Sequence, residues 1–582
     1  MIRIANCSGF FGDRISAARE MVEDGPIDVL TGDWLAELTM LILARTQARH
    51  PGQGYARTFL TQMEQVMGNC LDRGIKVVSN AGGLDPESCA LALADVAGRL
   101  GLSPRIAYVN GDNLLARLDE LATAGALSHF ETGEPLGDLS RFVTANAYLG
   151  CFGIVEALSE GADIVVTGRV TDAALVCGPA AWHYDWRRDN FDALAGAVVA
   201  GHVIECGAQV TGGNYSFFRE VPGMERVGFP WVEIAEDGSC VVGKHDGTGG
   251  EVSVGTVTSQ LLYEIASPSY FGPDVTARFD TIELEQVEAD RVRISGVRGE
   301  APPTTLKVAM NELGGYRKDL SVAITGLDIE GKADLVERAF WAASPHSRDQ
   351  FASVTSRLVR TDKSDPLTNE EAVATWRLTI KDPDEDKMGR ALADSVVELA
   401  LSTIPGFFIP GASPSPGSPY GVYCPALVPS NLVPQLVSVL GGERTVIDSV
   451  APAIATHVSA HQGWHATAPT GATTLAPLGA LVGARSGDKG GHANLGVFAR
   501  GDTAFAWLDS FLDVDQLKRL LPETEPLRVE RYRLPALRSL NFVIHDLLEE
   551  GVAASTRQDA QAKGLGEWLR SRYVEIPDSL LL

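Results

Sequence analysis

Closely spaced cysteines are missing from this sequence. No two of its cysteines form a C-x-x-C pair, and they are spread over most of the chain: Cys7, Cys70, Cys89, Cys151, Cys177, Cys206, Cys240 and Cys424. This spread gives neither a zinc site nor an iron–sulfur site, and it does not resemble a disulfide framework. We therefore expect mostly buried free thiols in a reducing cytosol, and no metal.

Positive charge is also scarce. The chain has 49 Lys and Arg residues against 75 Asp and Glu residues, which gives a net charge of −26. A surface this negative repels the phosphates of nucleic acids and anionic membranes, so we expect neither as a partner. An anionic small substrate is compatible with this charge, because a local cluster of Arg or Lys can reverse the field inside a cleft.

Long apolar runs and several catalytic motifs are absent as well. No run approaches the length of a membrane span, and residues 1–7 lead into a strand pattern without the apolar region of a secretory signal. We expect a cytoplasmic protein. The sequence contains no G-x-S-x-G elbow, Walker motif or kinase set.

The first third of the chain repeats one pattern, a short apolar run followed by small or polar residues and then a helix. The runs begin near Ile2, Ile27, Ile75, Arg105 and Asp163. Such strand–loop–helix units predict parallel strands with right-handed crossovers, covered on both faces. We predict an α/β fold whose large N-terminal domain holds a mostly parallel sheet of repeated βα units.

Three regions divide the chain. Residues 1–320 form the α/β domain and its mixed extension. Residues 321–460 contain a strand–helix–strand–strand–helix order, which is most of a ferredoxin-like layout, followed by a segment rich in Pro and Gly. A linker at 467–477 precedes a small α+β domain at 477–582.

Ligands of open parallel sheets bind beyond the carboxyl ends of the strands. We predict a substrate site there, and its residues are Ser8, Gly9, Asp33, Asn80, Gly82, Asn110, Arg169 and Asp172. Arg169 and Asp172 form either a clamp for a substrate carboxylate or a purely structural pair. The first loop is not G-x-G-x-x-G, so it serves as a simple turn, a substrate contact or, least favoured, a nucleotide site.

Three ionisable residues, Lys244, His245 and Asp246, stand together on a Gly-rich loop. They are the predicted catalytic residues, because His can transfer protons, Asp can orient it and Lys can stabilise an oxyanion. A polar turn after a hairpin is the equally favoured alternative. His457, His461 and His465 would share one helical face, where a solvated surface is favoured over a zinc site.

The C-terminal domain begins with a charged, Gly-rich loop at 485–494. Charges on such a loop suit contact with a ligand or a partner surface. We predict that the loop reaches the large domain and completes the site through Asp488 and Lys489.

Several of these motifs occur together in one family. The stretches Ala5-Asn6-Cys7-Ser8-Gly9, Thr31-Gly32-Asp33-Trp34, Ser79-Asn80-Ala81-Gly82-Gly83, Gly168-Arg169-Val170-Thr171-Asp172 and His245-Asp246-Gly247-Thr248 resemble the acyclic terpene utilisation (AtuA) family. Ala484-Arg485-Ser486-Gly487-Asp488-Lys489 resembles its appended ferredoxin-like domain, which carries no iron–sulfur cluster. The resemblance implies a catabolic setting and a branched acyl-CoA or carboxylic acid substrate.

We expect a lyase of the hydratase or dehydratase type, which needs an acid, a base and oxyanion stabilisation but no redox cofactor. We assign no cofactor, and a coenzyme A thioester is expected as a substrate rather than a cofactor. An NAD(P)-dependent oxidoreductase and a non-catalytic subunit of an acyl-CoA carboxylase are the alternatives. The partners we expect are a small-molecule substrate and further copies of the chain.

Overall fold

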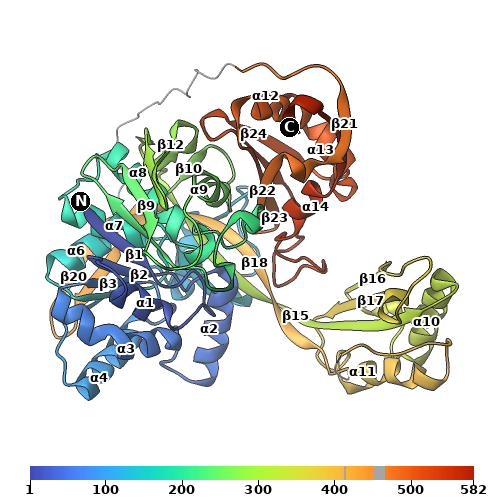
Figure 1. Cartoon of the computed structure of the whole chain (residues 1–582). Coiled ribbons are helices and arrows are strands. Elements are labelled where there is room, and N and C mark those ends of the chain that lie inside the picture. The colour runs from blue at the N-terminus through green and yellow to red at the C-terminus, as the bar shows by residue number, and fades with distance from the viewer. Residues whose placement is uncertain (412–413, 450–465, 582) are drawn as a thin grey trace. The chain divides into compact units, whose positions relative to one another are not determined.

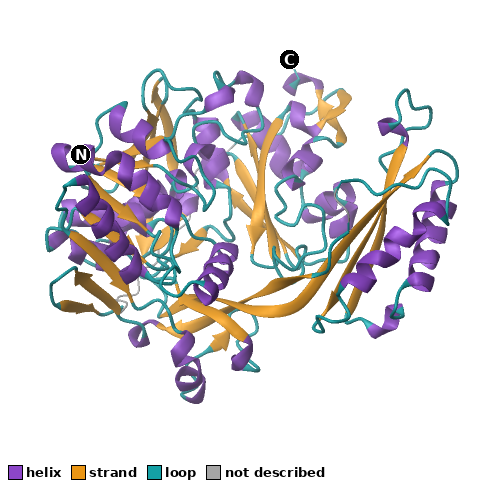
Figure 2. Ribbon diagram, turned by 90° about the horizontal axis from the view of Figure 1, so that it is seen from below, coloured by secondary structure: helices purple, strands orange, loops and turns teal. Residues whose placement is uncertain are grey.

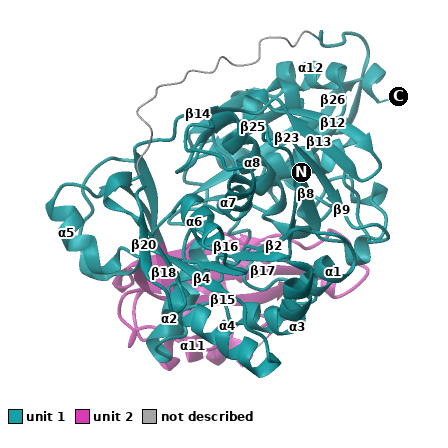
Figure 3. Cartoon of the chain, turned by 90° about the vertical axis from the view of Figure 1, so that its left-hand side faces the viewer, with its two compact units in different colours: residues 1–311, 423–552, 559–582 teal, residues 312–422, 553–558 magenta. Residues whose placement is uncertain are grey.

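The computed structural model describes residues 1–411, 414–449 and 466–581. It divides into two compact units, which Figure 3 colours separately. Unit 1 comprises residues 1–311, 423–552 and 559–582, and unit 2 comprises residues 312–422 and 553–558. The chain thus leaves unit 1 near the predicted boundary at 320 but returns at Tyr423, well before residue 460. The predicted C-terminal domain lies mainly in unit 1. His457, His461 and His465 lie outside the described residues.

Five parallel strands form the centre of unit 1. They are β1 (Ile2–Asn6), β2 (Val29–Gly32), β3 (Lys76–Ser79), β4 (Ile106–Asn110) and β7 (Ile164–Thr167). Their order is β1-β2-β3-β7-β4, and every neighbouring pair is parallel. The five predicted strand–loop–helix units are confirmed.

Helices cover both faces of this parallel region. One core contains Val77 and Val166 with α1 (Ala17–Glu23), α2 (Glu37–Arg49), α3 (Arg57–Arg73) and α4 (Pro86–Leu100). The other contains Val78 and Val165 with α6 (Phe152–Ser159), α7 (Ala174–His183) and α8 (Phe191–Ile204). Successive strand residues enter opposite cores, which is why the strands read as continuous apolar runs.

Antiparallel strands extend the sheet at both ends to eleven strands. Beyond β1 lie β8 (Pro230–Ile234), β9 (Cys240–Lys244), β13 (Arg291–Ser295) and β12 (Glu283–Glu288); beyond β4 lie β19 (Gln435–Val439) and β20 (Arg444–Ile447). The β8–β9 hairpin turns at Asp237 and Gly238. Gly238 has φ +84°, a conformation that glycine adopts readily.

Unit 2 is ferredoxin-like. Its elements are β15 (Thr305–Thr325), α10 (Ile329–Ala343), β16 (Ser353–Val359), β17 (Val373–Asp382), α11 (Arg390–Val397) and β18 (Ser418–Pro429). The sheet order is β16-β17-β15-β18, the arrangement of a split βαβ fold. Figure 1 labels each of these elements, and Figure 2 shows their strands as one layer. The segment rich in Pro and Gly leads into β18, the fourth strand.

The C-terminal domain is α+β, as predicted. Its sheet is β22 (Val482–Lys489), β23 (His492–Ala499), β25 (Ser539–Ile544) and β24 (Val529–Leu534), with helices α12 (Asp502–Phe511), α13 (Val514–Leu520) and α14 (Leu565–Arg570). The predicted linker at 467–477 is shorter than expected, because β21 (Thr473–Pro477) pairs with β26 (Tyr573–Pro577). Within the described ranges, no helix is long and apolar enough to cross a membrane.

Candidate functional site

The loops after the first three parallel strands are joined by hydrogen bonds. The backbone N–H of Asp33, after β2, donates to the carbonyl of Ser8, after β1, at 2.9 Å. Asn80, after β3, donates from Nδ2 to Asp33 Oδ1 at 2.5 Å and accepts from the backbone N–H of Trp34 at 2.8 Å. The structure therefore brings three of the predicted site residues together at the carboxyl edge of the sheet.

The two predicted glycines at this edge lie against backbone. A Cβ atom on Gly82 would come within 2.5 Å of the carbonyl oxygen of Thr167. A Cβ atom on Gly9 would come within 2.6 Å of the carbonyl carbon of Cys206. Both positions therefore need glycine for close packing of the site's framework, whether or not they also touch a substrate.

Arg169 follows β7 and is only 3% exposed. Its backbone N–H donates to Asp112 Oδ2 at 2.9 Å, and Asp112 also accepts from Asn146 at 2.7 Å. Burial outweighs these hydrogen bonds and raises the pKa of Asp112 to about 6. Asn110, a predicted site residue, is the last residue of β4 and pairs with Leu436 of β19. The side chain that supports Arg169 from the loop after β4 is instead that of Asp112.

The guanidinium of Arg169 is held by an acid and an aromatic ring. Nη1 forms an ion pair with Asp172, and the guanidinium carbon lies 4.2 Å from the centroid of the Tyr148 ring. Burial acts to lower the pKa of Arg169, but Asp172, Tyr148 and Asp33 outweigh it and hold the pKa well above its usual value. Nε has no hydrogen-bond partner in the described part of the chain, which leaves one buried donor for a ligand.

A second charged group lies beside Arg169, and sequence reasoning did not select it. Tyr148 donates to Glu37 Oε1 at 2.9 Å. Lys307 of β15 places Nζ 3.6 Å from the same oxygen and 5.0 Å from the centroid of the Tyr148 ring. Burial acts to raise the pKa of Glu37, but Lys307 and Arg169 outweigh it and hold the pKa at about 2. Glu37 is therefore ionised at neutral pH.

The end of α8 supplies further buried polar groups. Glu205 is 8% exposed, and its Oε2 atom has no hydrogen-bond partner among the residues described. Burial and the nearby carboxylates of Asp172 and Glu264 raise the pKa of Glu205 well above its usual value. His202 Nδ1 lies 3.1 Å from Glu205 Oε1, and burial and Lys489 lower the pKa of this histidine to about 4. At neutral pH His202 is therefore uncharged.

The C-terminal domain reaches this region through the β22–β23 hairpin. Lys489 donates from Nζ to the carbonyl of Glu264 at 2.7 Å, and the backbone N–H of Glu264 donates to Asn494 Oδ1 at 2.8 Å. The predicted contact with the large domain is confirmed. The segment is not the open loop we expected, because its residues pair as two strands up to Lys489 and His492.

The hairpin adds one acid and one base with shifted pKa values. Asp488 lies 3.7 Å from Lys563 Nζ, and burial and Glu264 raise the pKa of Asp488 to about 7. Burial and Lys307 lower the pKa of Lys489. The charge of Lys307, in the N-terminal part of unit 1, therefore acts on Lys489 of the C-terminal domain.

The three predicted catalytic residues are not brought together. Lys244 pairs with Asp290 Oδ2 at 3.1 Å, and Asp246 is exposed. His245 is 4% exposed, and its Nε2 atom lies 3.0 Å from the carbonyl oxygen of Met21 in α1. Burial lowers the pKa of His245. Neighbouring residues at a strand end point in different directions, so proximity in sequence does not make these residues one group.

The residues around Arg169 form a single electrostatic group, which we call the Arg169 cluster. Its members are Asp33, Glu37, Tyr148, Arg169, Asp172, Glu205, Glu264, Lys307, Asp488, Lys489 and Lys563. Burial and Asp172 raise the pKa of Asp33, so Asp33 and Glu205 retain protons where Glu37 is ionised. Acidic groups whose environments separate their pKa values can serve as proton donor and acceptor in one site.

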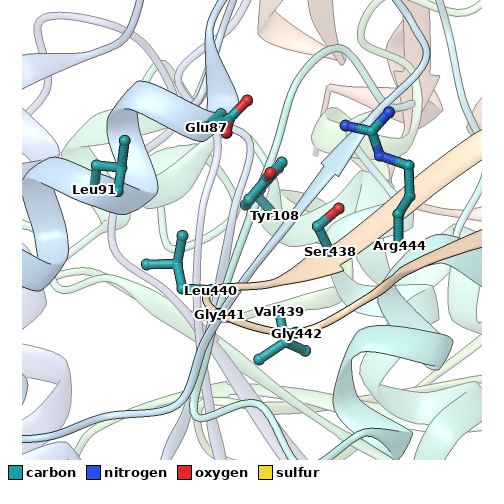
Figure 4. Close-up of a pocket in the computed structure, with 9 residues that line it drawn as sticks. All are labelled: Glu87, Leu91, Tyr108, Ser438, Val439, Leu440, Gly441, Gly442 and Arg444. Atoms are coloured by element: carbon teal, nitrogen blue, oxygen red, sulfur yellow. The ribbon is translucent and has the colours of Figure 1, made fainter.

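A pocket of about 510 Å³ opens elsewhere on unit 1, between α4, β4 and the β19–β20 turn. Figure 4 shows Leu91 and Glu87 from the helix opposite Ser438 of β19 and Arg444 of β20. Its lining contains no predicted site residue and no member of the Arg169 cluster. We assign it no part in the chemistry.

Two family models match the chain. The model of the acyclic terpene utilisation family protein AtuA matches residues 2–439, and the model of the AtuA ferredoxin-like domain matches residues 476–575. No curated protein and no solved structure matches the chain. Every member of the Arg169 cluster falls within one of the two matched spans.

Proposed function

The chain belongs to the acyclic terpene utilisation AtuA family, and we propose that in this catabolic setting it is a lyase of the hydratase or dehydratase type. Its substrate is a branched unsaturated acyl-CoA or carboxylic acid. The observation that carries the proposal lies in the Arg169 cluster, where two buried atoms, Arg169 Nε and Glu205 Oε2, have no partner among the described residues. Most buried polar atoms in proteins have a hydrogen-bond partner, so a neighbouring pair without one is a place where a polar ligand can bind.

The reaction adds water across a carbon–carbon double bond conjugated to a carbonyl group. Asp488, with a pKa of about 7, accepts a proton from water as the hydroxyl adds to the β carbon. Glu205, whose pKa is raised by burial and by Asp172, donates its proton to the α carbon. Solvent then restores both protonation states, and dehydration follows the same steps in reverse.

Negative charge develops on the carbonyl oxygen between these steps. The charged guanidinium of Arg169, which is buried, and the ammonium group of Lys307, which is half-buried, stabilise this charge. Asp172 holds Arg169 through the ion pair at Nη1, and Glu37 holds Lys307, whose Nζ atom lies 3.6 Å from Glu37 Oε1. A carboxylate substrate would use the same cations.

The first βα loop provides an argument against the alternative function, an NAD(P)-dependent oxidoreductase. In the first βα loop, the backbone N–H of Gly9 donates to Asp13 Oδ2 at 2.8 Å, and that of Arg14 donates to Asp13 Oδ1 at 2.7 Å. A carboxylate of the chain thus occupies the amides that would hold a pyrophosphate.

The test is an assay of the full chain with branched 2-enoyl thioesters and the matching free acids, without added nicotinamide or flavin. We expect the absorbance of the conjugated double bond to fall as water adds. Activity that appears only with NAD(P) or flavin would contradict the proposal.

A further inference from the structure

A buried histidine lies against the proposed proton donor, and the reaction as described gives it no role. His202 is 1% exposed, Glu205 is 8% exposed, and Nδ1 of the histidine lies 3.1 Å from Oε1 of the acid. The two atoms are within hydrogen-bonding distance but are not aligned as a hydrogen bond. Neither ring nitrogen of His202 has a hydrogen-bond partner in the part of the chain that the structure describes, and the same holds for Glu205 Oε2.

The fold holds the backbone of the acid and the ring of the histidine. The carbonyl of Glu205 accepts a hydrogen bond from Nδ2 of Asn6, in β1, at 2.9 Å. The His202 ring packs against the rings of Tyr270, in β10 (Ser269–Phe271), and Phe279, with centroid distances of 5.4 and 5.5 Å. The last torsion of a glutamate is soft, so the carboxyl group can turn until Oε1 aligns with Nδ1. Catalytic hydrogen bonds are often poorly aligned in the free enzyme and tighten when the substrate binds.

The surroundings of the ring favour one of its two neutral forms. Because the pKa of His202 is lowered to about 4, the ring carries a single proton at neutral pH, on Nδ1 or on Nε2. On Nε2 this proton would belong to a buried donor without an acceptor among the described residues, which costs free energy. On Nδ1 it has Glu205 Oε1 within reach. The ring then donates to Oε1, and the carboxyl proton of Glu205 lies on Oε2.

We infer that His202 is a positioning residue for Glu205: its Nδ1–H group bonds Oε1 and keeps the transferable proton on Oε2, the oxygen without a partner. The inference rests on the proposed function, in which Glu205 gives this proton to the α carbon. As the O–H bond breaks and the C–H bond forms, negative charge stays on the carboxylate. The same Nδ1–H group then stabilises that charge, and no proton leaves the ring.

This hydrogen bond also affects the pH at which Glu205 loses its proton. The carboxylates of Asp172 and Glu264 favour the protonated form of Glu205, and the cations Arg169 and Lys489 favour the ionised form. A donor at Nδ1 adds to the second effect, because it bonds the ionised form more strongly. Removing the donor therefore raises the pKa of Glu205. Since a proton donor must be protonated, the decline of activity at high pH then moves to higher pH.

The test compares two variants of His202 in the full chain by kcat, pH–rate profile and melting curve. His202→Asn keeps an N–H donor as many bonds from the backbone as Nδ1 but loses the ring. His202→Phe keeps the ring against Tyr270 and Phe279 but loses the donor. We expect kcat of His202→Phe to fall by about tenfold to 100-fold, as for the loss of a hydrogen bond to a charged group, with its decline shifted to higher pH. His202→Asn should keep a kcat and a pH profile close to those of the wild type.

The matched controls are His183→Phe and His183→Asn, because this histidine of α7 also packs on an aromatic ring, that of Tyr184 at 4.7 Å, but lies outside the cluster. Both controls should keep wild-type kinetics. Wild-type kcat in His202→Phe would overturn the inference, and so would a loss of activity in both His202 variants without a shift of the pH profile. Either result would leave the ring a packing role only.

A second measurement needs no activity and separates this inference from the lyase reaction. We expect NMR signals of the ring nitrogens of His202, identified by their absence from His202→Asn, to show a proton on Nδ1 at neutral pH. A proton on Nε2 would overturn the inference even in an active hydratase. A proton on Nδ1 in a chain that hydrates none of the substrates would contradict the lyase reaction and leave the bond between His202 and Glu205 in place.

Discussion

The Nζ atom of Lys489 lies 2.7 Å from the carbonyl oxygen of Glu264, so a side chain of the C-terminal domain bonds the backbone at the Arg169 cluster. Glu264 has φ +57°, a left-handed conformation that is unusual for a residue with a side chain. Such backbone strain is often found at functional sites. The C-terminal domain is therefore part of the candidate site.

Replacing Lys489 tests this role. We expect Lys489→Met to lower kcat by about tenfold to 100-fold, because the cluster loses a cation and a bond that positions Glu264. Arg528→Ala, which removes an exposed ion pair with Glu530, is the matched control in the same domain. Steady-state kinetics and melting curves of both variants make the comparison. Wild-type kcat in Lys489→Met would show that the hairpin only packs against the large domain.

The pKa of Asp488 gives a pH dependence for activity. As the base, Asp488 must be ionised, so kcat/KM is expected to rise as the pH increases through about 7. Asp488→Asn should remove most of the activity and the rise with it. A pH–rate profile of wild type and variant checks this, and an unchanged profile in the variant would assign the base elsewhere.

The same group has the opposite effect on stability. Burial and Glu264 raise the pKa of Asp488 to about 7 in the folded chain, above its ordinary value of 3.8. The folded state therefore retains a proton that the unfolded state loses between these values, so stability falls as the pH rises from about 4 to 7. Asp488→Asn cannot lose this proton, and its Tm relative to wild type should increase from pH 4 to pH 8. A constant difference in Tm would contradict the burial of this carboxyl.

His245 separates the sequence-based hypothesis from the structural one. The sequence-based hypothesis predicts that His245→Ala abolishes turnover and leaves thermal stability nearly unchanged. The structure leads us to expect the reverse, a lower Tm with kcat near wild type, because the ring is buried against α1 and bonds Met21. Measuring kcat and Tm of this one variant decides between them. Lost turnover at an unchanged Tm would restore His245 as the catalytic base.

Regular βα spacing explains why much of the site's framework could be predicted. Ser8, Asp33, Asn80 and Arg169 each follow a parallel strand, and parallel strands present their carboxyl ends at one edge. Lys307 and Tyr148 gave no such signal. Lys307 lies inside the 21-residue strand β15, and Tyr148 follows a strand outside the repeated units, so only the tertiary fold brings them to Glu37.

The motif at Lys244, His245 and Asp246 shows which part of the site the sequence could not predict. Three ionisable residues on a Gly-rich loop suggested one catalytic group, but their side chains bind Asp290, approach Met21 and face solvent, respectively. Local composition identifies residues capable of chemistry. It does not determine which way each side chain points, and that depends on the register of the hairpin that ends at Lys244.

Arg169 is the residue on which the proposed chemistry depends most directly, and Arg169→Lys preserves its charge while removing the planar guanidinium. We predict that this variant loses at least about 100-fold in kcat/KM for hydration of a branched 2-enoyl substrate. Arg188→Lys, which alters an arginine that lies 4.2 Å from the Phe152 ring outside the cluster, should keep wild-type kinetics. The decisive measurement is kcat/KM of the two variants under identical conditions. A selective loss in Arg169→Lys supports the account, and equal activity in both variants would contradict it.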